Sequence, residues 1–553
     1  MARTAQSCGD PAIRVGSITY HSVVTTTAGV QLLTRENLEN FKASLSAALR
    51  TTSTADDALS DRFIELRPGT VATLKSGVNH LVTGRRGVGK STTLAVLQRR
   101  AQAEGARVIF VDVEQHKSRQ YPDVLIEIII DILKEIQPNR WAWTKSQRML
   151  RRQVKKLLAV LSALRDAAAE VTQNTEIDQT KTTDFGVRLQ GGIAKQYAKL
   201  SGTAGSSGSA RAKLSQTSTQ TRRKEDFLRD LAPAIARVLE VAANLDGRKS
   251  LLLVLDDFYF ISKDKQPLVL DHLHGITKRS NVWLKIGSVR SRTQSYADGD
   301  PPLGMQPPHD LQHLSLDVGL ADFATAQAFL EEVATGVLGP AGFRIRDILT
   351  QTARERAVLI AGGAVARDYF DLLIASADTA WESAQRRNAA TFTIGTEDVQ
   401  AAAGLRLERK QSDLRNDAGR DATRLETRFD DLVSFVRNRE TFFFSRAPGA
   451  HGHRLGSREI VELEDLRFVH RIMTTRPNTA SWRGVDTIVF MIDFAALVAK
   501  RMRKAPVEFW KPGKSDELRR AEWVYVPDWT ASSNGVKNGP REVLPTSEPL
   551  PFK

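Results

Sequence analysis

A glycine-rich turn at residues 84–91 constrains this chain more than any other feature. Residues 79–83 read as a short strand with Leu81 and Val82 at its centre, and residues 94–100 favour a helix. Between them stands the run Gly-Arg-Arg-Gly-Val-Gly-Lys-Ser, which fits the spacing Gly-x-x-x-x-Gly-Lys-Ser. Glycines let consecutive backbone N–H groups turn inward around a phosphate, because no Cβ stands in the way. The segment predicts a phosphate-binding loop between a strand and a helix.

The loop implies a nucleoside triphosphate and a magnesium ion as ligands. Lys90 is expected to reach the β- and γ-phosphates, and the Ser91 hydroxyl is expected to bind Mg²⁺. The N-terminus of the following helix adds the positive end of its dipole. The residues expected to contact the nucleotide are Gly84, Arg85, Arg86, Gly87, Val88, Gly89, Lys90, Ser91 and Thr92.

A second segment supplies acids for the same site. Residues 251–255 form a continuous apolar run that ends in Asp256 and Asp257. Such a run is typical of a strand buried on both faces of a parallel sheet. We expect Asp256 to hold Mg²⁺ through water, and Asp257 to orient or deprotonate the attacking water.

Three further segments read as strands, at residues 108–113, 282–287 and 311–316, with helical patterns between the strands. This alternation predicts an α/β fold with a parallel five-stranded sheet and helices on both faces. Right-handed crossovers would bring the loop, Asp256 and Ser288 to one carboxyl edge, where ligands bind.

Composition narrows the class of protein. The chain has 553 residues, which predicts three or four domains, and its formal net charge is +15. Such a charge favours a polyanionic partner, most often nucleic acid, although a generally basic proteome would give the same balance. The single Cys8 excludes a disulfide framework. Charged residues interrupt the longest apolar runs, so we expect no membrane span and a cytoplasmic protein.

Four segments resemble AAA+ ATPases of the replication-initiator and origin-recognition group, and also the related STAND signalling ATPases. They are residues 83–91, 253–257, 285–290, and 361–370 followed by 392–399. The resemblance covers about residues 60–403 and implies a Mg²⁺-dependent ATPase whose core is closed by a helical lid. In these families the position of Asp257 is often Glu. The shorter Asp holds its carboxylate further back, which implies slow hydrolysis.

The resemblance also assigns roles outside the phosphate loop. Ser288 matches the sensor-1 position of AAA+ proteins, and Arg290 matches the arginine that STAND proteins place just past the same strand. Arg367 matches the sensor-2 arginine that reaches back to the γ-phosphate, or it pairs with Asp368 or Asp371 on its own helix. The expected catalytic set is therefore Lys90, Asp257, Ser288, Arg290 and Arg367, with Ser91 and Asp256 as metal ligands.

We expect five regions along the chain: an N-terminal segment (1–60), the ATPase core (61–318), a lid (319–404), a C-terminal domain (405–530) and a tail (531–553). An insertion at about 141–222 interrupts the core. It begins with a long helix whose expected apolar stripe is Met149, Val154, Leu157, Leu161 and Leu164 and whose first half is basic. The insertion is either a basic arm that contacts DNA or a partner, or a solvated loop.

The C-terminal domain is expected to be a winged helix, by resemblance to initiator-type ATPases. Residues 408–438 read as one or two charged helices, and residues 459–473 as an amphipathic helix with Arg467, His470 and Arg471 exposed. The basic face of this helix either contacts DNA or is only solvated.

Two functions fit the sequence. The first is an ATP-binding, slowly hydrolysing AAA+-like regulator that assembles on DNA as a homo-oligomer. Arg290 or Arg292 would then complete the site of a neighbouring subunit. The second is a STAND-type switch that acts with a separately encoded protein effector, for example in a bacterial antiviral or mobile-element system. Binding of duplex DNA distinguishes the two.

Overall fold

The computed structural model describes residues 32–49, 63–138, 141, 144–167, 170–176, 187–189, 217–278, 280–418, 421–447, 457–476, 485–498, 502, 506–519 and 523–525. The predicted tail at 531–553 and most of the predicted N-terminal segment lie outside these residues.

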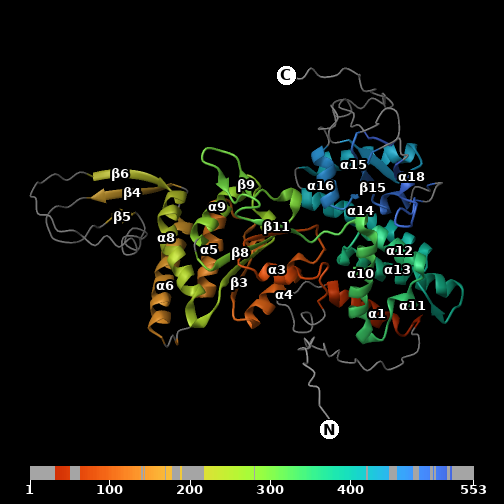
Figure 1. The fold of residues 1–553 in the computed structure, drawn as a ribbon, viewed down its shortest axis with the longest axis horizontal. Helices are drawn as coiled ribbons and strands as arrows, with labels where there is room; N and C mark the ends of the chain where they lie inside the picture. Colours follow the sequence, from red (N-terminus) through yellow and green to blue (C-terminus); the bar gives the residue numbers. More distant parts are fainter. Residues whose placement is uncertain are drawn as a thin grey trace, which may run out of the picture.

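A five-stranded sheet forms the centre of the molecule (Figure 1). Its order is β11-β2-β8-β7-β3, and every neighbouring pair is parallel. The strands are β2 (His80–Thr83), β3 (Arg107–Asp112), β7 (Leu251–Asp256), β8 (Val282–Ser288) and β11 (Gln312–Ser315). The predicted α/β fold is confirmed, and each strand lies where the apolar runs placed it.

The central strand β7 is buried on both faces because residues 251–255 are all apolar. In β7, Leu251, Leu253 and Leu255 face one cluster, and Leu252 and Val254 face the other. Alternate residues of a strand point to opposite faces, so a two-sided burial demands a continuous apolar run. The helices are α3 (Thr70–Lys75) and α4 (Lys90–Ala103) on one face, and α5 (Asp123–Ile136), α8 (Lys224–Ala243) and α9 (Gln266–Thr277) on the other.

The predicted long helix of the insertion is α6 (Lys145–Asp166), which packs against α5 and α8. Thr144 caps it, because its hydroxyl accepts a hydrogen bond from the backbone N–H of Gln147 at 3.1 Å. The buried stripe is Leu150, Val154, Leu157, Val160, Leu161 and Leu164. The prediction of Met149 in this stripe is wrong: Met149 is 49% exposed, because the helix turns its neighbour Leu150 inward instead.

Beyond α6 and α8 lies a separate antiparallel sheet of β4 (Glu170–Glu176), β5 (Val187–Leu189) and β6 (Thr217–Arg223), in the order β5-β4-β6 (Figure 1). Residues 190–216 of the predicted insertion lie outside the described residues.

The lid consists of α10 (Phe323–Leu338), α11 (Ile345–Ile348), α12 (Gln351–Ala361), α13 (Ala366–Arg386) and the first part of α14 (Thr396–Ala418). The N-terminal α1 (Leu38–Leu49) belongs to the same core, since its buried residues Leu38, Phe41 and Leu45 join the lid cluster. In addition, β1 (Leu33–Thr34) pairs with β12 (Thr391–Phe392). Part of the predicted N-terminal segment is thus built into the lid.

The C-terminal region follows α14 without a break. Its helices are α15 (Ala422–Asn438), α16 (Ser457–Asp465), α17 (Ala495–Val498) and α18 (Asp516–Arg519). Its strands are β13 (Phe443–Arg446), β14 (Val469–Thr475) and β15 (Thr487–Ile492), in the antiparallel order β13-β15-β14. Of the one or two helices predicted over 408–438, the structure has two, the end of α14 and α15. The predicted boundary at 404/405 falls inside α14.

The prediction of one helix over residues 459–473 is wrong. The helix ends at Asp465, and Val469–Thr475 pairs with β15 as a strand. The exposed face expected there is also wrong for two of its three residues. His470 is 2% exposed, and the Arg467 side chain lies mostly buried, whereas Arg471 is exposed.

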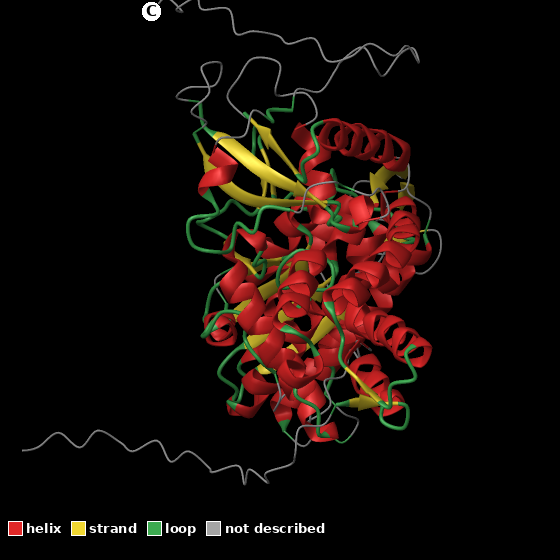
Figure 2. Ribbon diagram, turned by 90° about the vertical axis from the view of Figure 1, so that its right-hand side faces the viewer, coloured by secondary structure: helices red, strands yellow, loops and turns green. Residues whose placement is uncertain are grey.

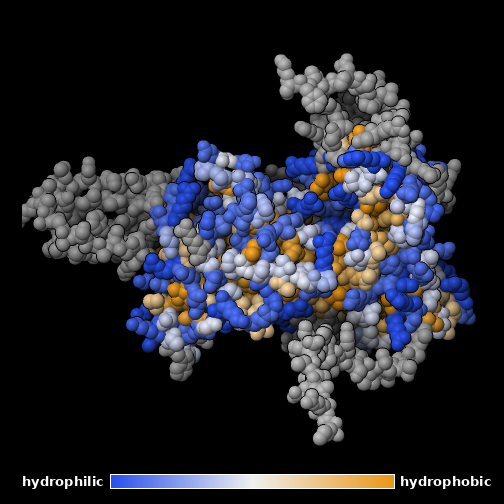
Figure 3. Space-filling view, in the orientation of Figure 1, coloured by the Kyte–Doolittle hydropathy of each residue, from blue (hydrophilic) through white to orange (hydrophobic). Residues whose placement is uncertain are grey.

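Helices cover most of the strands in the view of Figure 2, and the surface in Figure 3 is largely hydrophilic over the part that holds α6 and α8. Within the part of the chain that the structure describes, every helix is too short or too polar to cross a lipid bilayer.

Candidate nucleotide site

The phosphate loop adopts the left-handed backbone that its glycines permit. Gly87 has φ 84° and Gly89 has φ 93°, and Gly89 is the N-cap residue of α4. A Cβ at Gly84 would lie 2.6 Å from Cγ2 of Val88. The predicted loop between β2 and α4 is therefore present, with its backbone wrapped too tightly at Gly84 for any side chain.

Lys90 lies under the loop rather than on an exposed turn, and only 6% of the residue is exposed. Its Nζ donates hydrogen bonds to the carbonyl oxygens of Gly84 at 2.8 Å and Arg85 at 3.2 Å. Burial lowers the pKa of Lys90, and the carboxylates of Asp257 and Asp256 oppose that shift. The Lys90 amine therefore lies under the loop, near the carboxylates of both predicted acids.

Asp256 and Asp257 extend from the carboxyl end of β7. Burial raises the pKa of Asp256, and a hydrogen bond from the Ser91 side chain opposes the rise. Asp257 stands just past the strand with φ 52° and ψ 38°, and its backbone N–H donates to Oδ1 of Asp256 at 2.9 Å. Burial, and next the Asp256 carboxylate, raises the pKa of Asp257 to about 6.

Sequence reasoning missed Gly287, which lies in β8 beside these acids. A Cβ at Gly287 would stand 2.5 Å from Oδ1 of Asp256 and 2.8 Å from Cδ1 of Leu94. The glycine leaves room for the Asp256 carboxylate. A glycine inside a strand next to a phosphate loop is the signal that would have found it.

Ser288 and Arg290, the two alternative sensors, lie in different environments. The Ser288 hydroxyl is fully buried at the end of β8 and shares a 2.6 Å hydrogen bond with the Thr293 hydroxyl. Arg290 is exposed in the short helix η4 (Arg290–Arg292), and its charge acts on His313 and Glu464. Only Ser288 is aligned with the loop strand, opposite Thr83 in the parallel register.

Arg367 lies at the second position of α13, directly against the loop. Its backbone N–H donates to the carbonyl of Gly87 at 3.4 Å, and its Cβ lies 3.0 Å from the position of a Cβ on Gly87. The side chain is exposed. The lid therefore approaches the loop at the residue predicted to sense the nucleotide.

Arg85 is a second link between loop and lid, and its place in the motif does not predict these contacts. Its Nε donates to Oδ1 of Asp317 at 3.2 Å, and its Nη1 donates to the carbonyl of Gly362 at 2.9 Å. Its backbone N–H also donates to Asp317 at 2.9 Å. This buried guanidinium joins the phosphate loop to the end of β11 and to the turn between α12 and α13.

Charged pairs connect the lid to the C-terminal region behind this turn. Arg467 forms an ion pair with Asp368 at 2.5 Å, and Arg406 lies 3.7 Å from the same carboxylate. Lys410 forms an ion pair with Asp493. Asp368 and Asp371, the two alternative partners predicted for Arg367, both lie beside Arg406.

Helix α16 rests on the ATPase core. The Asp465 carboxylate accepts a hydrogen bond from the backbone N–H of Ser291 at 2.7 Å, and burial raises the pKa of Asp465. Burial likewise raises the pKa of Glu464, although Arg85 opposes the rise. The acidic end of α16 thus holds the short segment that contains Arg290 and Arg292.

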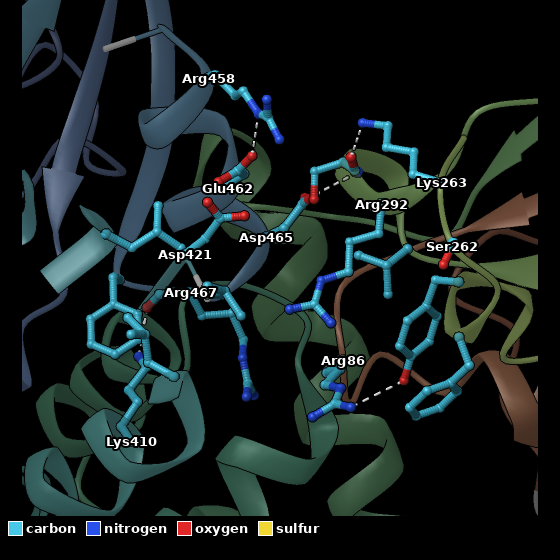
Figure 4. Close-up of a pocket in the computed structure, with 18 of the residues that line it drawn as sticks. Arg86, Ser262, Lys263, Arg292, Lys410, Asp421, Arg458, Glu462, Asp465 and Arg467 are labelled. Atoms are coloured by element: carbon cyan, nitrogen blue, oxygen red, sulfur yellow. Dashed lines mark hydrogen bonds and ion pairs between the residues drawn. The ribbon is translucent and has the colours of Figure 1, made fainter. Parts of the chain in front are cut away.

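A cavity of about 300 Å³ lies between the ATPase core and the C-terminal region (Figure 4). Its core wall includes Arg86, Tyr259 and Arg292, and its C-terminal wall includes Arg458 and Arg467. Arg86 donates to the Tyr259 hydroxyl at 3.1 Å.

Exposed cations cover the outer side of α6, as the sequence predicted. Lys145, Arg148, Arg152, Lys155 and Lys156 are all exposed, and none forms an ion pair with a carboxylate of a described residue. Trp141, which precedes the helix, is 64% exposed.

Comparisons with known proteins extend this description. No family model and no curated protein matches the chain. Among solved structures, Drosophila ORC bound to DNA matches with 11% identity and a TM-score of 0.34, over 89% of this chain and 97% of that chain. The Aeropyrum pernix ORC1 protein in complex with DNA matches with 15% identity and a TM-score of 0.31, over 85% and 92%. The Aeropyrum pernix ORC2 protein with ADPNP and ADP matches with 13% identity and a TM-score of 0.32, over 81% and 98%.

These matches are ORC proteins, the group that the sequence motifs resemble. Their TM-scores are low, so the assignment of the fold rests on the sheet order and on the phosphate loop between β2 and α4.

Proposed function

We propose that this chain binds Mg²⁺-ATP, hydrolyses it slowly and assembles on DNA as an AAA+-type regulator. The observation that carries the proposal is the gathering of Lys90, Ser91, Asp256 and Asp257 at one edge of the sheet, under a loop shaped for phosphate. The start of α13 closes against the same loop.

The residues at this edge fit a magnesium ion. Mg²⁺ prefers oxygen ligands, and the Ser91 hydroxyl and Asp256 carboxylate already contact each other. Bound there, Mg²⁺ would neutralise charge on the phosphates. Lys90 would exchange its loop carbonyls for phosphate oxygens, and the Ser288 hydroxyl would donate to the γ-phosphate.

Asp257 is the proposed proton acceptor for the attacking water. A raised pKa suits a general base that works near neutral pH. Its side chain is shorter than Glu, and its position just past the strand end sets its carboxylate back, so we expect slow turnover. The exposed Arg367 would turn toward the γ-phosphate when ATP binds.

For DNA, we propose the exposed face of α6 as the main contact. We propose a winged helix for this region. The proposal is supported by the strand order β13-β15-β14, with α15 before the sheet and α16 between β13 and β14. However, α16 ends in acids and rests on the core through Asp465. Its charge and its burial both disfavour contact with phosphates, whereas α6 offers cations that no described carboxylate pairs.

The test is a filter-binding measurement on the full chain with duplex DNA, with and without ATP, run beside an ATPase assay. We expect ATP-stimulated binding that weakens steeply with salt, together with slow hydrolysis that requires Mg²⁺. Absence of DNA binding at low salt in the presence of ATP would contradict the DNA part, and absence of ATP binding would contradict the whole proposal.

A second candidate is a STAND-type switch held closed between signals. The contact between Asp465 and Ser291 favours it, because it ties the segment that contains Arg290 and Arg292 to α16 of the same chain. Sedimentation with a non-hydrolysable ATP analogue distinguishes the candidates: a DNA-independent shift from monomer to assembly supports the switch, and assembly only with DNA supports the first proposal.

A further inference from the structure

We propose that the cavity between the ATPase core and the C-terminal region is a second ligand site, for a small phosphate-bearing molecule. It does not overlap the predicted nucleotide contacts except at Arg86, since neither Lys90, Ser91, Asp256 nor Asp257 lines it. Its volume of about 300 Å³ lies at the lower end of the range of ligand pockets, and junctions between domains are common places for such sites.

The charge of the lining selects an anion. Six cationic side chains line the cavity, against three acids; the cations are Arg86, Lys263, Arg292, Lys410, Arg458 and Arg467. Three of them have carboxylate partners: Lys410 pairs with Asp493 and Arg467 with Asp368, both beyond the lining, and Arg458 pairs with Glu462 within it. Arg86, Lys263 and Arg292 then outnumber the two other lining acids, Asp421 and Asp465. Arginine side chains present flat, forked donors that match phosphate oxygens.

Arg467 gives the most specific indication. Its backbone has φ 66°, which a residue with a side chain seldom adopts, so the turn between α16 and β14 is strained at this point. Its Nε is buried and has no hydrogen-bond acceptor among the described residues. An acceptor from a ligand in the cavity would satisfy this N–H, and strained backbone is often retained where it serves binding.

Aromatic rings form the neighbouring part of the wall. Tyr259 stacks on Phe260 with 4.6 Å between ring centroids, and the guanidiniums of Arg86 and Arg292 each lie 5.8 Å from the centroid of the Tyr259 ring. Figure 4 shows Arg86, Arg292 and Arg467 reaching toward the space between the two walls. This surface suits the phosphate of a small molecule, with room for a planar group beside Tyr259.

A ligand here would bridge two parts of the chain. Arg86 belongs to the phosphate loop, whereas Arg458 and Arg467 belong to the C-terminal region. Simultaneous contact would favour the closed arrangement in which α16 rests on the core, so the ligand would stabilise that state by its own binding free energy.

The test is calorimetry on the full chain with the phosphate loop first saturated by a non-hydrolysable ATP analogue and Mg²⁺. Pyrophosphate and AMP are then titrated separately. Saturable binding of either supports the site, and tighter binding of AMP shows that the planar group is recognised too. The initial titration of the analogue reports on the nucleotide site, so failure there is distinguishable from failure of the second site.

Variants place the binding in the cavity. Arg467→Gln is expected to weaken it about tenfold or more, because a charged donor and a satisfied N–H are lost. Lys263 is an exposed lining residue outside the ion pairs, and Lys263→Gln is expected to weaken ligand binding about threefold. This variant tests the site even if Arg467→Gln misfolds. Arg471→Gln is the matched control: it is exposed on β14, donates to Thr474 and does not line the cavity.

The expected pattern is weakening in the two lining variants and unchanged affinity in the control. The proposal is overturned if neither pyrophosphate nor AMP binds to the analogue-saturated protein. It is equally overturned if both lining variants bind them as tightly as the parent chain does.

Discussion

The imidazole of His470 occupies the place where a side chain on Gly362 would begin. A Cβ at Gly362 would lie 2.2 Å from Cε1 of His470. Gly362 is also the residue whose carbonyl accepts the hydrogen bond from Arg85 of the phosphate loop. One turn of the lid therefore contacts the nucleotide site on one side and the C-terminal region on the other.

Replacement of Gly362 by alanine is expected to loosen the packing of β14 of the C-terminal region against this turn of the lid. Gly362 has φ 74°, so alanine adds backbone strain of about 1 kcal/mol to the clash with a buried ring. Limited proteolysis should cut the region after α14 faster than in the parent. Gly339→Ala, at a lid position where a Cβ meets nothing within 4 Å, is the control and should behave as the parent does.

Gly287→Ala is expected to disable the metal side of the site. The new methyl group would collide with Oδ1 of Asp256, which must then leave its position beside Ser91. We expect the Mg²⁺-dependent part of ATP affinity to fall at least tenfold in calorimetry. Gly275→Ala, in α9 with nothing within 4 Å, should leave it unchanged. Equal Mg²⁺ dependence in both variants would show that Asp256 does not serve the metal.

Asp257→Asn is expected to bind ATP but not turn it over. In the parent, the carboxylate accepts a proton only when ionised, so kcat/KM should fall as the pH drops through about 6. The folded-state pKa of about 6 lies above the ordinary value of 3.8. Ionisation of Asp257 therefore destabilises the ligand-free fold increasingly as the pH rises from about 4 to about 6, and the destabilisation persists at higher pH. Thermal unfolding should then show the variant more stable than the parent at pH 7, with the difference lost near pH 4. Turnover at the parent rate would place the base elsewhere.

Lys90→Ala is expected to abolish tight ATP binding, because the amine is the only described Lys under the loop carbonyls. We expect affinity to fall about a hundredfold or more, given a lost charge-assisted contact to two phosphates. Gln102→Ala, on the exposed last turn of the same helix, is the control. Calorimetry with ATP that gives the same affinity for parent and Lys90→Ala would remove the loop from the mechanism.

Charge reversal on α6 tests the DNA surface. Arg152→Glu with Lys156→Glu should weaken binding to all duplex sequences alike and flatten the dependence on salt, since fewer counterions are released. Arg386→Glu with Arg387→Glu, an equal change at the exposed end of α13, is the matched control. If both double variants lose affinity equally, the effect is that of net charge, and α6 is not the binding surface.

Sequence alone located the sheet well, because its strands are buried on both faces and leave continuous apolar runs such as Leu251 to Leu255. The phosphate loop was equally clear, since its function demands particular residues at fixed spacing. The prediction of helix for residues 469–473 is wrong because their apolar spacing fits both the helical and the strand period. Only pairing with the distant β15 determines that they form a strand. The burial of Arg467 and His470 depends on Asp368 and Asp493, partners that no local pattern reveals.

Helix α14 begins in the lid and ends in the C-terminal region, and its 23 residues span about 35 Å. A continuous helix is a stiff rod, so the two regions cannot pivot independently about their shared boundary. A tilt of about 10° where the lid meets the phosphate loop would sweep the far end of such a rod through roughly 6 Å. Through such a rod, a small change at the nucleotide would become a larger displacement at the far end of α14.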